Sequence, residues 1–539
     1  MSKLIPSPKI SEEKIDQELS QLVEETAVFQ QTIEHKYTRY EAIRAYPRTC
    51  VYILILLWVM ILVGYETQAG GMVVSIPTFR RDFGYYFEGD YVLDGKWQSA
   101  ISGGPSGSVV IGGFLGSYMA DSIGRKLTLL IAVGATIGFI VLEYVSTTIE
   151  VFFAGKFLNA LSLGIIAAVS TSLIAEITPL ALRGLSVAAI SLSLSLGPFV
   201  CYLIANTTST RDDRMAYRSL FLSQWAFSGT SFIMLFCIPE SPYYYVLKNA
   251  DEKALKQLRK LYKGEALAKH QLTVIKKTVE EARHTTISSS FVDCFRGINL
   301  KRTFIAISPF IMQPMSGVAY VGSYSTYFFQ LAGYNTHSSF QISVGQQALS
   351  ILGCIASWFI LDRFGRRHVM LYGMISLFVL NVITAGLGCS NKESYLTGAS
   401  AFMTMYNFFY NPSIGPLSYV INAENPSSQL RVKTISIGLA ANNGLQCMWQ
   451  FVLPFMFNPD QANMGSKINF IFAACCFISI FCFYFYLPET ANRSFDEIDE
   501  MYIKKVPARK FRNFISDTQI KATEQNDEKK GLEVEHIEA

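Results

Sequence analysis

Charged residues are scarce in this chain. Lys, Arg, Asp and Glu make up 16% of its 539 residues, whereas soluble proteins carry about a quarter. Half of the residues are hydrophobic and the mean hydropathy is +0.27, so most of the chain suits a hydrocarbon environment better than water. The net charge of +4 is too small to indicate a nucleic-acid partner. These values exclude an ordinary soluble protein.

The residue patterns of enzymes and metal sites are also missing. The ten cysteines form no CxxC pair and no cluster with histidine, and most lie inside apolar runs, where they pack as small hydrophobic residues. The sequence shows no nucleophile–base pair in a soluble domain and no phosphate-binding loop. It therefore predicts no enzyme activity, metal, cofactor or disulfide, and it indicates no particular protein partner. Because no signal peptide is present, we expect the first apolar run to direct the chain to the bilayer.

Apolar runs of roughly 20 residues are abundant, and this length crosses a hydrocarbon layer about 30 Å thick. We count twelve runs, six on each side of a polar middle segment. They predict an all-α membrane protein with twelve transmembrane helices in two six-helix halves. The predicted spans are 51–71, 98–120, 127–147, 151–173, 185–205, 219–238, 303–326, 341–361, 369–389, 396–421, 434–457 and 467–487.

The polar segments divide the chain into five parts. The middle segment is rich in Glu, Lys and Leu, which indicates short amphipathic helices at a membrane surface. The predicted parts are an N-terminal tail at 1–50, a first half at 51–238, a linker at 239–302, a second half at 303–487 and a C-terminal tail at 488–539.

Basic residues mark one side of this predicted membrane protein. They collect in the even-numbered turns, such as Arg125-Lys126 and Arg363 to Arg367, with Arg80 and Arg81 in the first outer loop as a local exception. Since Arg and Lys gather on the cytoplasmic side, we expect both tails in the cytoplasm. The loop after the fifth span then faces outward, and it carries a glycosylation sequon at Asn206.

Three charged motifs occur twice, in the same order in both halves. The turn from Asp121 to Lys126 is a weaker copy of the turn from Asp362 to Arg367. Ordered repetition indicates two parallel halves, with a substrate site between them near the middle of the membrane. The other repeated pairs are Glu176 with Arg183 and Glu424 with Arg431, then Pro239 to Pro242 and Pro488 to Thr490.

These motifs together resemble the signatures of the sugar porter family of the major facilitator superfamily, over about residues 51–500. The finer pattern is similar to the fungal α-glucoside (maltose-type) permeases in the runs Gly64 to Thr67, Tyr324 to Phe328 and Pro426 to Thr434. The resemblance implies the major facilitator fold and a sugar transporter of the plasma membrane.

In that family the charged motifs close the cytoplasmic gate, and the resemblance implies the same role here. Near water each ion pair contributes about 0.2–1 kcal/mol, and networks contribute more. Alternatively, the basic turns only hold the loops inside the cell. The predicted gating residues are Asp121, Arg125, Glu176, Arg183, Asp362, Arg366, Glu424 and Arg431.

Glu66 lies at the end of the apolar run in the first span, where a carboxylate is costly unless it is paired, protonated or facing a wet cavity. By resemblance it stands at the acidic position that takes up the proton in proton-coupled porters. The family's usual arginine in the fourth span is Lys156 here. The two residues either couple transport to protons or form a structural ion pair.

A sugar site needs several hydrogen-bonding groups together with flat aromatic faces. By resemblance, Gln313 matches the leading sugar-binding glutamine of the seventh span, followed by Pro314 where a second glutamine is common. Tyr419 stands where a stacking tryptophan is common. Each polar residue could instead bond a neighbouring helix. The predicted sugar-binding residues are Gln313, Tyr324, Gln346, Tyr419, Asn442 and Asn443.

The sequence thus predicts a secondary transporter that moves a hexose or an α-glucoside such as maltose by alternating access, with proton symport. Two alternatives stay open, a facilitative carrier and a sugar sensor of the same fold that does not transport. Sensors of this kind usually carry long cytoplasmic tails, and the short segment after Pro488 argues against one.

Overall fold

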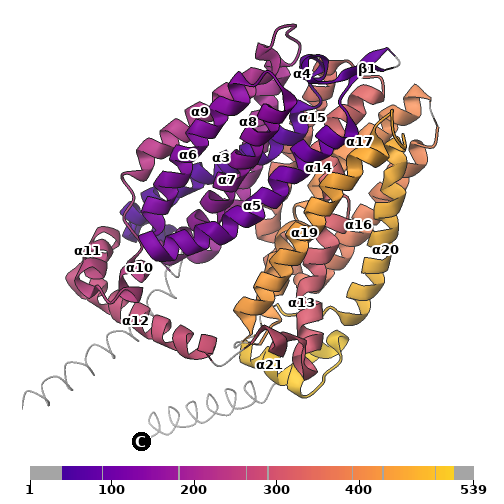
Figure 1. Cartoon of the computed structure of the whole chain (residues 1–539). Coiled ribbons are helices and arrows are strands. Elements are labelled where there is room, and N and C mark those ends of the chain that lie inside the picture. The colour runs from indigo at the N-terminus through magenta and orange to yellow at the C-terminus, as the bar shows by residue number, and fades with distance from the viewer. Residues whose placement is uncertain are drawn as a thin grey trace, which may run out of the picture.

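The structure is a computed structural model of the whole chain. It describes residues 39–514, apart from gaps at 88, 180–181, 263, 288–289, 391, 428–429, 492 and 494. Most of that part is helical, and the long helices form two bundles (Figure 1). The predicted all-α membrane architecture with two halves of six transmembrane helices is confirmed. Most of the predicted tails, 1–38 and 515–539, lies outside the described residues.

The first half consists of six long helices that begin and end within a few residues of the predicted spans. The first begins at Pro47, and proline suits the first turn because its missing N–H would have no helical partner there. The second begins after Asp94, whose side chain accepts the backbone N–H of Lys96. The six helices are α3 (Pro47–Val73), α5 (Gly95–Ile123), α6 (Arg125–Val145), α7 (Ile149–Ile177), α8 (Arg183–Thr208) and α9 (Met215–Leu235).

Two spans of the second half are broken helices, which the continuous apolar runs did not reveal. The seventh span breaks at Gly317, whose φ of +103° is rarely adopted by residues with a side chain. The tenth span breaks around Pro412, where the ring removes a backbone donor. The helices are α13 (Gly297–Met315), α14 (Val318–Leu331), α15 (Thr336–Phe364), α16 (Arg366–Leu387), α17 (Glu393–Tyr410), α18 (Ile414–Glu424), α19 (Arg431–Phe457) and α20 (Asn469–Tyr486).

Four of the twelve spans are less apolar than the others. Eight stretches in the described part of the chain are long and apolar enough to cross a membrane by length and composition alone. The remaining spans are α5, α9, the pair α17–α18, and α19. Helices α5 and α19 pack against each other across the two halves. At that contact Ser99 of α5 bonds the backbone of Phe451 in α19.

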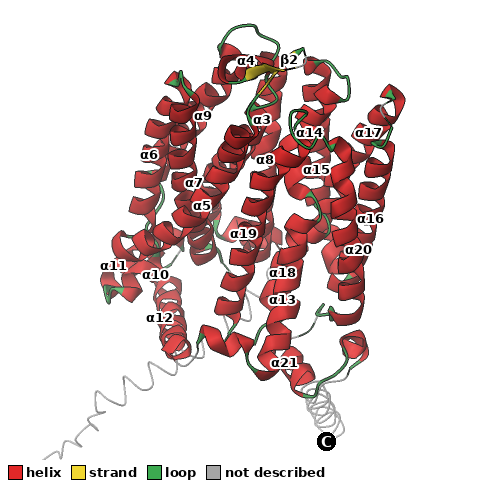
Figure 2. Ribbon diagram, turned by 45° about the vertical axis from the view of Figure 1, so that its right-hand side comes forward, coloured by secondary structure: helices red, strands yellow, loops and turns green. Residues whose placement is uncertain are grey.

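Polar segments gather at the two ends of the bundle (Figure 2). We call one the linker end, because it carries α10 (Pro242–Leu247), α11 (Asp251–Leu261), α12 (Glu265–Ile287) and α21 (Phe495–Ile503). We call the opposite one the hairpin end. It carries α4 (Pro77–Phe83) and an antiparallel pair of strands, β1 (Tyr85–Phe87) and β2 (Asp90–Val92). The other short helices are α2 (Arg39–Ala45), η2 (Phe291–Phe295), η3 (Gly465–Ile468) and η4 (Ala508–Asn513).

Each half has its own hydrophobic core. In the second half the rings of Tyr320, Phe457 and Phe472 are buried together. In the first half, the rings of Phe79 and Phe152 meet at 5.2 Å between their centroids. The buried ring of Phe340 in α15 also joins the first-half core, where it lies 6.5 Å from the ring of Tyr202, so apolar packing links the halves as well.

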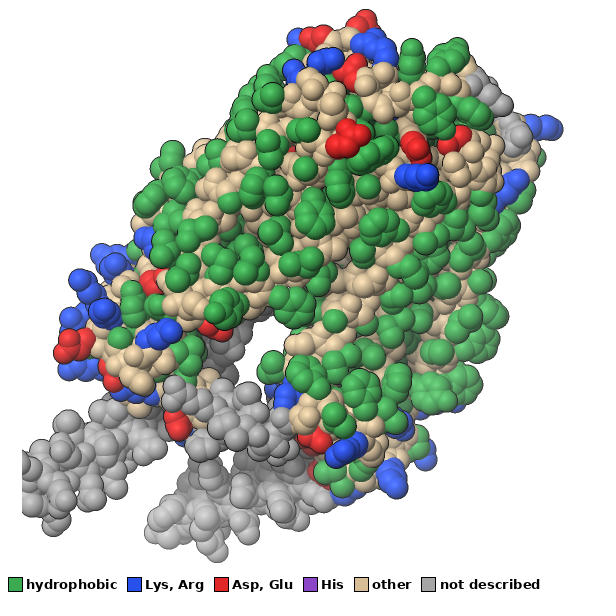
Figure 3. Space-filling model, viewed as in Figure 1, with side chains coloured by type: hydrophobic (Ala, Val, Ile, Leu, Met, Phe, Trp, Pro, Cys, Tyr) green, Lys and Arg blue, Asp and Glu red, His purple; other side chains and the backbone are tan. Residues whose placement is uncertain are grey.

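Hydrogen bonds join the two halves near the hairpin end. Ser99 Oγ of α5 donates to the carbonyl oxygen of Phe451 in α19 at 2.8 Å. Gln68 Nε2 of α3 donates to the carbonyl oxygen of Gly322 in α14 at 2.9 Å. At the linker end, by contrast, the surface is hollowed between the halves (Figure 3). The molecule is therefore closed at the hairpin end and open at the linker end.

Candidate functional site

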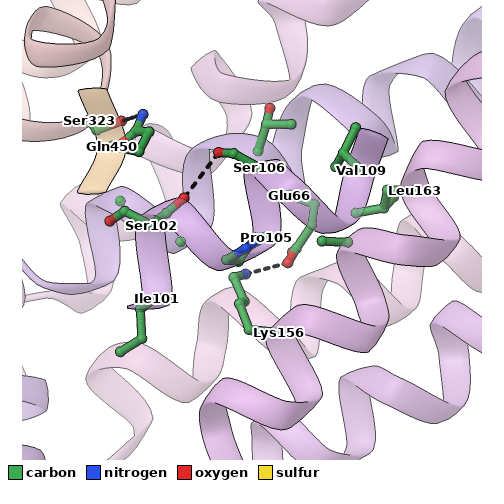
Figure 4. A pocket seen from close by; sticks show the side chains of 14 residues that line it. Glu66, Ile101, Ser102, Pro105, Ser106, Val109, Lys156, Leu163, Ser323 and Gln450 are labelled. Carbon is green, nitrogen blue, oxygen red and sulfur yellow. Dashed lines mark hydrogen bonds and ion pairs between the residues drawn. The ribbon is translucent and has the colours of Figure 1, made fainter. Parts of the chain in front are cut away.

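A pocket lies between the two halves, with about 480 Å³ of empty space that includes open solvent. Its wall is formed mainly by α3, α5 and α7 of the first half, and Ser323 and Gln450 close it from the second half (Figure 4). Hydroxyl, amide, carboxylate and ammonium groups all line it. Such a mixture suits a polar, uncharged ligand with several hydroxyl groups.

Glu66 and Lys156 meet in the wall of this cavity (Figure 4). Lys156 Nζ donates to one carboxylate oxygen of Glu66, and Gln224 Nε2 of α9 donates to the other. Only 3% of Glu66 and 1% of Lys156 are exposed, so both charges have left water. The structure brings this predicted pair together, while its role in proton coupling stays a prediction.

A second carboxylate, which our sequence analysis missed, touches the same lysine. Glu143 of α6 is fully buried, and its Oε2 lies 3.4 Å from Lys156 Nζ. Asn159 Nδ2 donates to Glu143 Oε1 at 2.9 Å. The available signal was an acidic residue inside the apolar span 127–147, because such residues usually have a functional or pairing role.

On the second-half side of the cavity, Gln450 Nε2 donates to Ser323 Oγ at 2.9 Å. Gln450 Oε1 is buried and has no hydrogen-bond partner within the described residues, so it can accept a hydroxyl from a ligand. Tyr324, a predicted sugar residue, is 1% exposed and donates to Ser102 Oγ in the cavity wall at 3.2 Å. Tyr324 therefore shapes the wall through Ser102. Gln450, Ser323 and Ser102 were missed from the sequence.

Two predicted sugar residues on different helices contact each other. Asn442 Nδ2 of α19 donates to Gln313 Oε1 of α13 at 2.6 Å and to the carbonyl oxygen of Phe310 at 2.9 Å. Gln313 Nε2 reaches the carbonyl oxygen of Gly415 at 3.4 Å. The ring of Tyr419 packs edge-on against Phe310, with 4.8 Å between centroids. These residues form one polar cluster inside the second half, separate from the residues that line the cavity.

The remaining two predicted sugar residues lie apart. Gln346 of α15 is 1% exposed and donates to the carbonyl oxygen of Val321 at 3.4 Å, so it ties α15 to α14. Its Oε1 atom has no hydrogen-bond partner in the described part of the chain. Asn443 of α19 is exposed. The structure brings neither residue to the cavity wall.

The first charged turn is held at the linker end by a carboxylate network within the first half. Arg125 binds Glu176 of α7 at 3.2 Å and Asp121 at 3.3 Å. Glu240 accepts the backbone N–H groups of Arg125 at 2.8 Å and of Lys126 at 3.1 Å, at the start of α6. Burial raises the pKa of the Glu240 carboxyl, and these N–H bonds oppose the rise.

The second charged turn repeats this arrangement. Arg366 binds Glu424 of α18 at 3.3 Å, and Glu489 accepts the backbone N–H groups of Arg366 at 2.9 Å and of Arg367 at 3.2 Å. Thr490 donates to Glu424 at 2.5 Å, just as Ser241 donates to Glu176 in the first half. Each of these ion pairs joins helices of the same half.

Other predicted residues of the turns can be placed only in part. The side chains of Arg183 and Asp362 lie outside the described residues. Arg431 opens α19 and is half-buried. Asn206 lies in the last turns of α8, half-buried, so its glycosylation stays a prediction.

Twelve membrane helices in two halves around a polar cavity define a membrane transporter with the major facilitator fold. The chain matches the family described as "Sugar (and other) transporter" over residues 51–502, and it belongs to that family. It is 30% identical to a general alpha-glucoside permease of Saccharomyces cerevisiae over 503 residues, which cover 92% of this chain and 82% of the relative. A maltose permease of the same yeast is 29% identical over 482 residues, which cover 88% and 78%. The predicted family resemblance is confirmed.

Solved structures support the same fold. The inward-open xylose transporter XylE from E. coli gives a TM-score of 0.66 at 20% identity, and the match covers 84% of this chain and 99% of XylE. Its partially occluded inward-open form gives 0.67 at 18% identity, covering 83% and 100%. The family match over residues 51–502, together with this fold, makes the chain a multi-pass membrane protein and a sugar transporter of the major facilitator superfamily.

Proposed function

We propose that this protein moves a hexose or an α-glucoside such as maltose across the plasma membrane by alternating access, coupled to proton symport. The observation that carries the proposal is the buried Glu66–Lys156 pair in the wall of the cavity between the two halves. A carboxylate there can gain and lose a proton beside a bound sugar, and the ammonium stabilises its charged form.

The linker end is cytoplasmic in this proposal, as are both tails. The turns at Arg125-Lys126 and Arg366-Arg367 lie at that end, bonded to Glu240 before α10 and to Glu489 before α21, and fit the excess of basic residues on cytoplasmic loops. The cavity then opens inward, and the hairpin end closes it toward the outside. The yeast relatives named for α-glucosides and maltose support the proposed substrate class.

Alternating access follows from the two contact zones. Closing the hollow at the linker end and parting the hydrogen bonds at the hairpin end would expose the same cavity to the other side. The two charged networks keep each half rigid at the linker end, because their ion pairs connect helices within one half. The halves can then move as bodies without breaking these pairs.

The first test is uptake of labelled maltose and glucose by cells that lack their own sugar permeases. The external pH is recorded in weakly buffered medium as each sugar is added. A proton symporter takes up label and makes the medium more alkaline. Uptake without a pH change would favour a facilitative carrier, and no uptake of either sugar would refute transport as proposed and favour a sensor.

The second test replaces the proton-binding group. We expect Glu66→Gln to abolish accumulation against a gradient while sparing exchange of sugar between two equilibrated pools. The matched control is Glu150→Gln, which removes an exposed carboxylate from the first turn of α7. Unchanged accumulation in Glu66→Gln would refute the proton role of Glu66.

A facilitative carrier is the second candidate, and one contact favours it. The Glu66 carboxylate already has two partners, Lys156 and Gln224, as expected of a structural ion pair. In that case, Glu66→Gln would change stability or sugar affinity without any difference in proton movement.

A further inference from the structure

The buried cluster around Lys156 has an unbalanced charge. Two carboxylates, Glu66 and Glu143, surround one ammonium, and at most 3% of each of the three residues is exposed. With all three groups ionised the cluster carries one net negative charge away from water, which is costly. Binding of one proton makes the cluster neutral.

The two carboxylates occupy different positions relative to the cavity. Glu66 lines it, whereas Glu143 of α6 is fully buried against Lys156 and Asn159 of α7 and is not among the residues of the wall. Each carboxylate accepts one amide N–H, Glu143 from Asn159 of α7 at 2.9 Å and Glu66 from Gln224 of α9, so contact with the cavity is what distinguishes them. The ring of Phe221 lies 5.4 Å from Lys156 Nζ and covers the ammonium from α9.

We propose that Glu143 is a positioning residue for proton coupling: it is the counterion that Lys156 keeps when Glu66, its nearer partner, carries the transported proton. This inference rests on the proton symport proposed above. It assigns different tasks to two acidic residues that touch the same lysine.

The charge balance explains why the second carboxylate matters. When Glu66 takes a proton on a carboxylate oxygen, it loses its charge, and Lys156 keeps Glu143 as its partner. Without Glu143, the same protonation would leave an ammonium buried with no counterion. Proton binding to Glu66 would then need a higher proton concentration, so coupled transport would shift toward acid pH.

Other ionisable groups surround the cluster. Tyr65 of α3 bonds Ser223 at 2.6 Å, and the thiol of Cys201 is buried in α8. Arg218 of α9 lies 5.3 Å from the ring centroid of Tyr144, the neighbour of Glu143. The ion pairs found for Lys156 in the described part of the chain are those with Glu66 and Glu143.

The test is the pH dependence of sugar accumulation in the full-length protein with Glu143→Gln. We expect the pH of half-maximal accumulation to fall by about one unit or more, a tenfold higher proton concentration. Exchange between equilibrated sugar pools should be retained, which shows that the variant folds. Glu150→Gln, with the same chemical change at an exposed site, should leave the pH profile unchanged.

A second variant keeps Glu143 and weakens its ionised form. Asn159→Leu removes the donor to Glu143 Oε1, and we expect a smaller acid shift in the same direction. If Glu143→Gln does not exchange sugar, the Asn159→Leu profile decides the matter. A pH midpoint equal to that of the unmodified protein, in a variant that still exchanges sugar, would overturn the role of Glu143.

The proposed function fails in a different way. If the unmodified protein moves sugar with no proton uptake and no dependence of accumulation on pH, proton symport itself is refuted. If the unmodified protein is coupled to protons but neither variant shifts its profile, only the assignment of Glu143 is wrong.

Discussion

Arg80 and Gln330 join the two halves at the hairpin end. Arg80 Nη1 of α4 donates to Gln330 Oε1 of α14 at 3.0 Å, and Gln330 Nε2 donates to the carbonyl oxygen of Ser75 at 2.7 Å. Arg80 is 3% exposed and also binds the carbonyl oxygens of Val74 at 3.1 Å and Tyr91 at 3.0 Å. Arg80, the exception to the expected distribution of basic residues, is thus a buried contact between the halves.

We therefore expect Gln330→Leu to weaken closure of the hairpin end. The substitution removes two hydrogen bonds, each with a net contribution of about 0.5–1.5 kcal/mol, so the closed state loses roughly 1–3 kcal/mol. Cys447, half-buried beside Gly103, should then react several-fold faster with an impermeant thiol reagent added outside, as measured by mass spectrometry of that residue.

The control for this experiment is Gln341→Leu, which makes the same change at an exposed position of α15. It should leave the labelling of Cys447 unchanged. Equal labelling rates in Gln330→Leu and in the unmodified protein would show that Arg80 and Gln330 do not hold the hairpin end closed.

Gly365 is required by the geometry of the second charged turn. Its φ is +81°, and a Cβ atom there would lie 2.6 Å from a carboxylate oxygen of Glu489. We expect Gly365→Ala to lower stability by about 1–3 kcal/mol. Thermal unfolding of the purified protein in detergent measures this loss.

The matched control is Gly386→Ala, also at one end of α16, where a Cβ would meet no atom within 4 Å. Alanine favours a helix over glycine by up to about 1 kcal/mol, so this variant should be as stable as the unmodified protein or slightly more stable. Equal stability of the two alanine variants would refute a structural requirement at Gly365.

The apolar runs predicted the fold because a membrane helix must be long and apolar, whatever its neighbours. They did not show the breaks at Gly317 and Pro412, because proline also occurs inside unbroken membrane helices of this chain, as at Pro105 and Pro198. The duplicated turns were visible because their charges recur in order. Helices α5 and α19 have a weaker apolar signal because they face the cavity as well as lipid.

The site was less predictable, because contacts between helices have no signal in a single sequence. Gln313 and Asn442 were singled out by family resemblance, and the structure shows that they touch. Glu143 was overlooked because its sequence neighbours do not indicate that Lys156 of the next helix is its partner. An acidic residue in an apolar span was nevertheless a signal in itself. In the sequence, nothing distinguishes Gln450 from other amide side chains in membrane helices. The structure places it in the cavity wall, and its Oε1 has no hydrogen-bond partner within the described residues.

Gln313→Leu should weaken sugar binding if the Gln313–Asn442 cluster is part of the sugar site. Loss of one or two neutral hydrogen bonds would raise the sugar concentration at half-maximal uptake roughly two- to tenfold. Ser376→Ala, at a half-buried residue whose hydroxyl bonds the carbonyl oxygen of Tyr372 in its own helix, is the control. An unchanged half-saturation for the transported sugar would refute a place for this cluster in the sugar site.

Lys156→Gln should be among the most damaging substitutions in the chain. It leaves the carboxylates of Glu66 and Glu143 buried without a cation, and removal of one partner from a buried ion pair costs about 3–5 kcal/mol. Thermal unfolding in detergent at neutral pH measures this loss.

The added substitution Glu143→Gln should restore part of the stability, because one buried carboxylate then remains instead of two. If the double variant is less stable than Lys156→Gln by the full cost of Glu143→Gln alone, the two sites act independently and the shared electrostatic cluster is refuted.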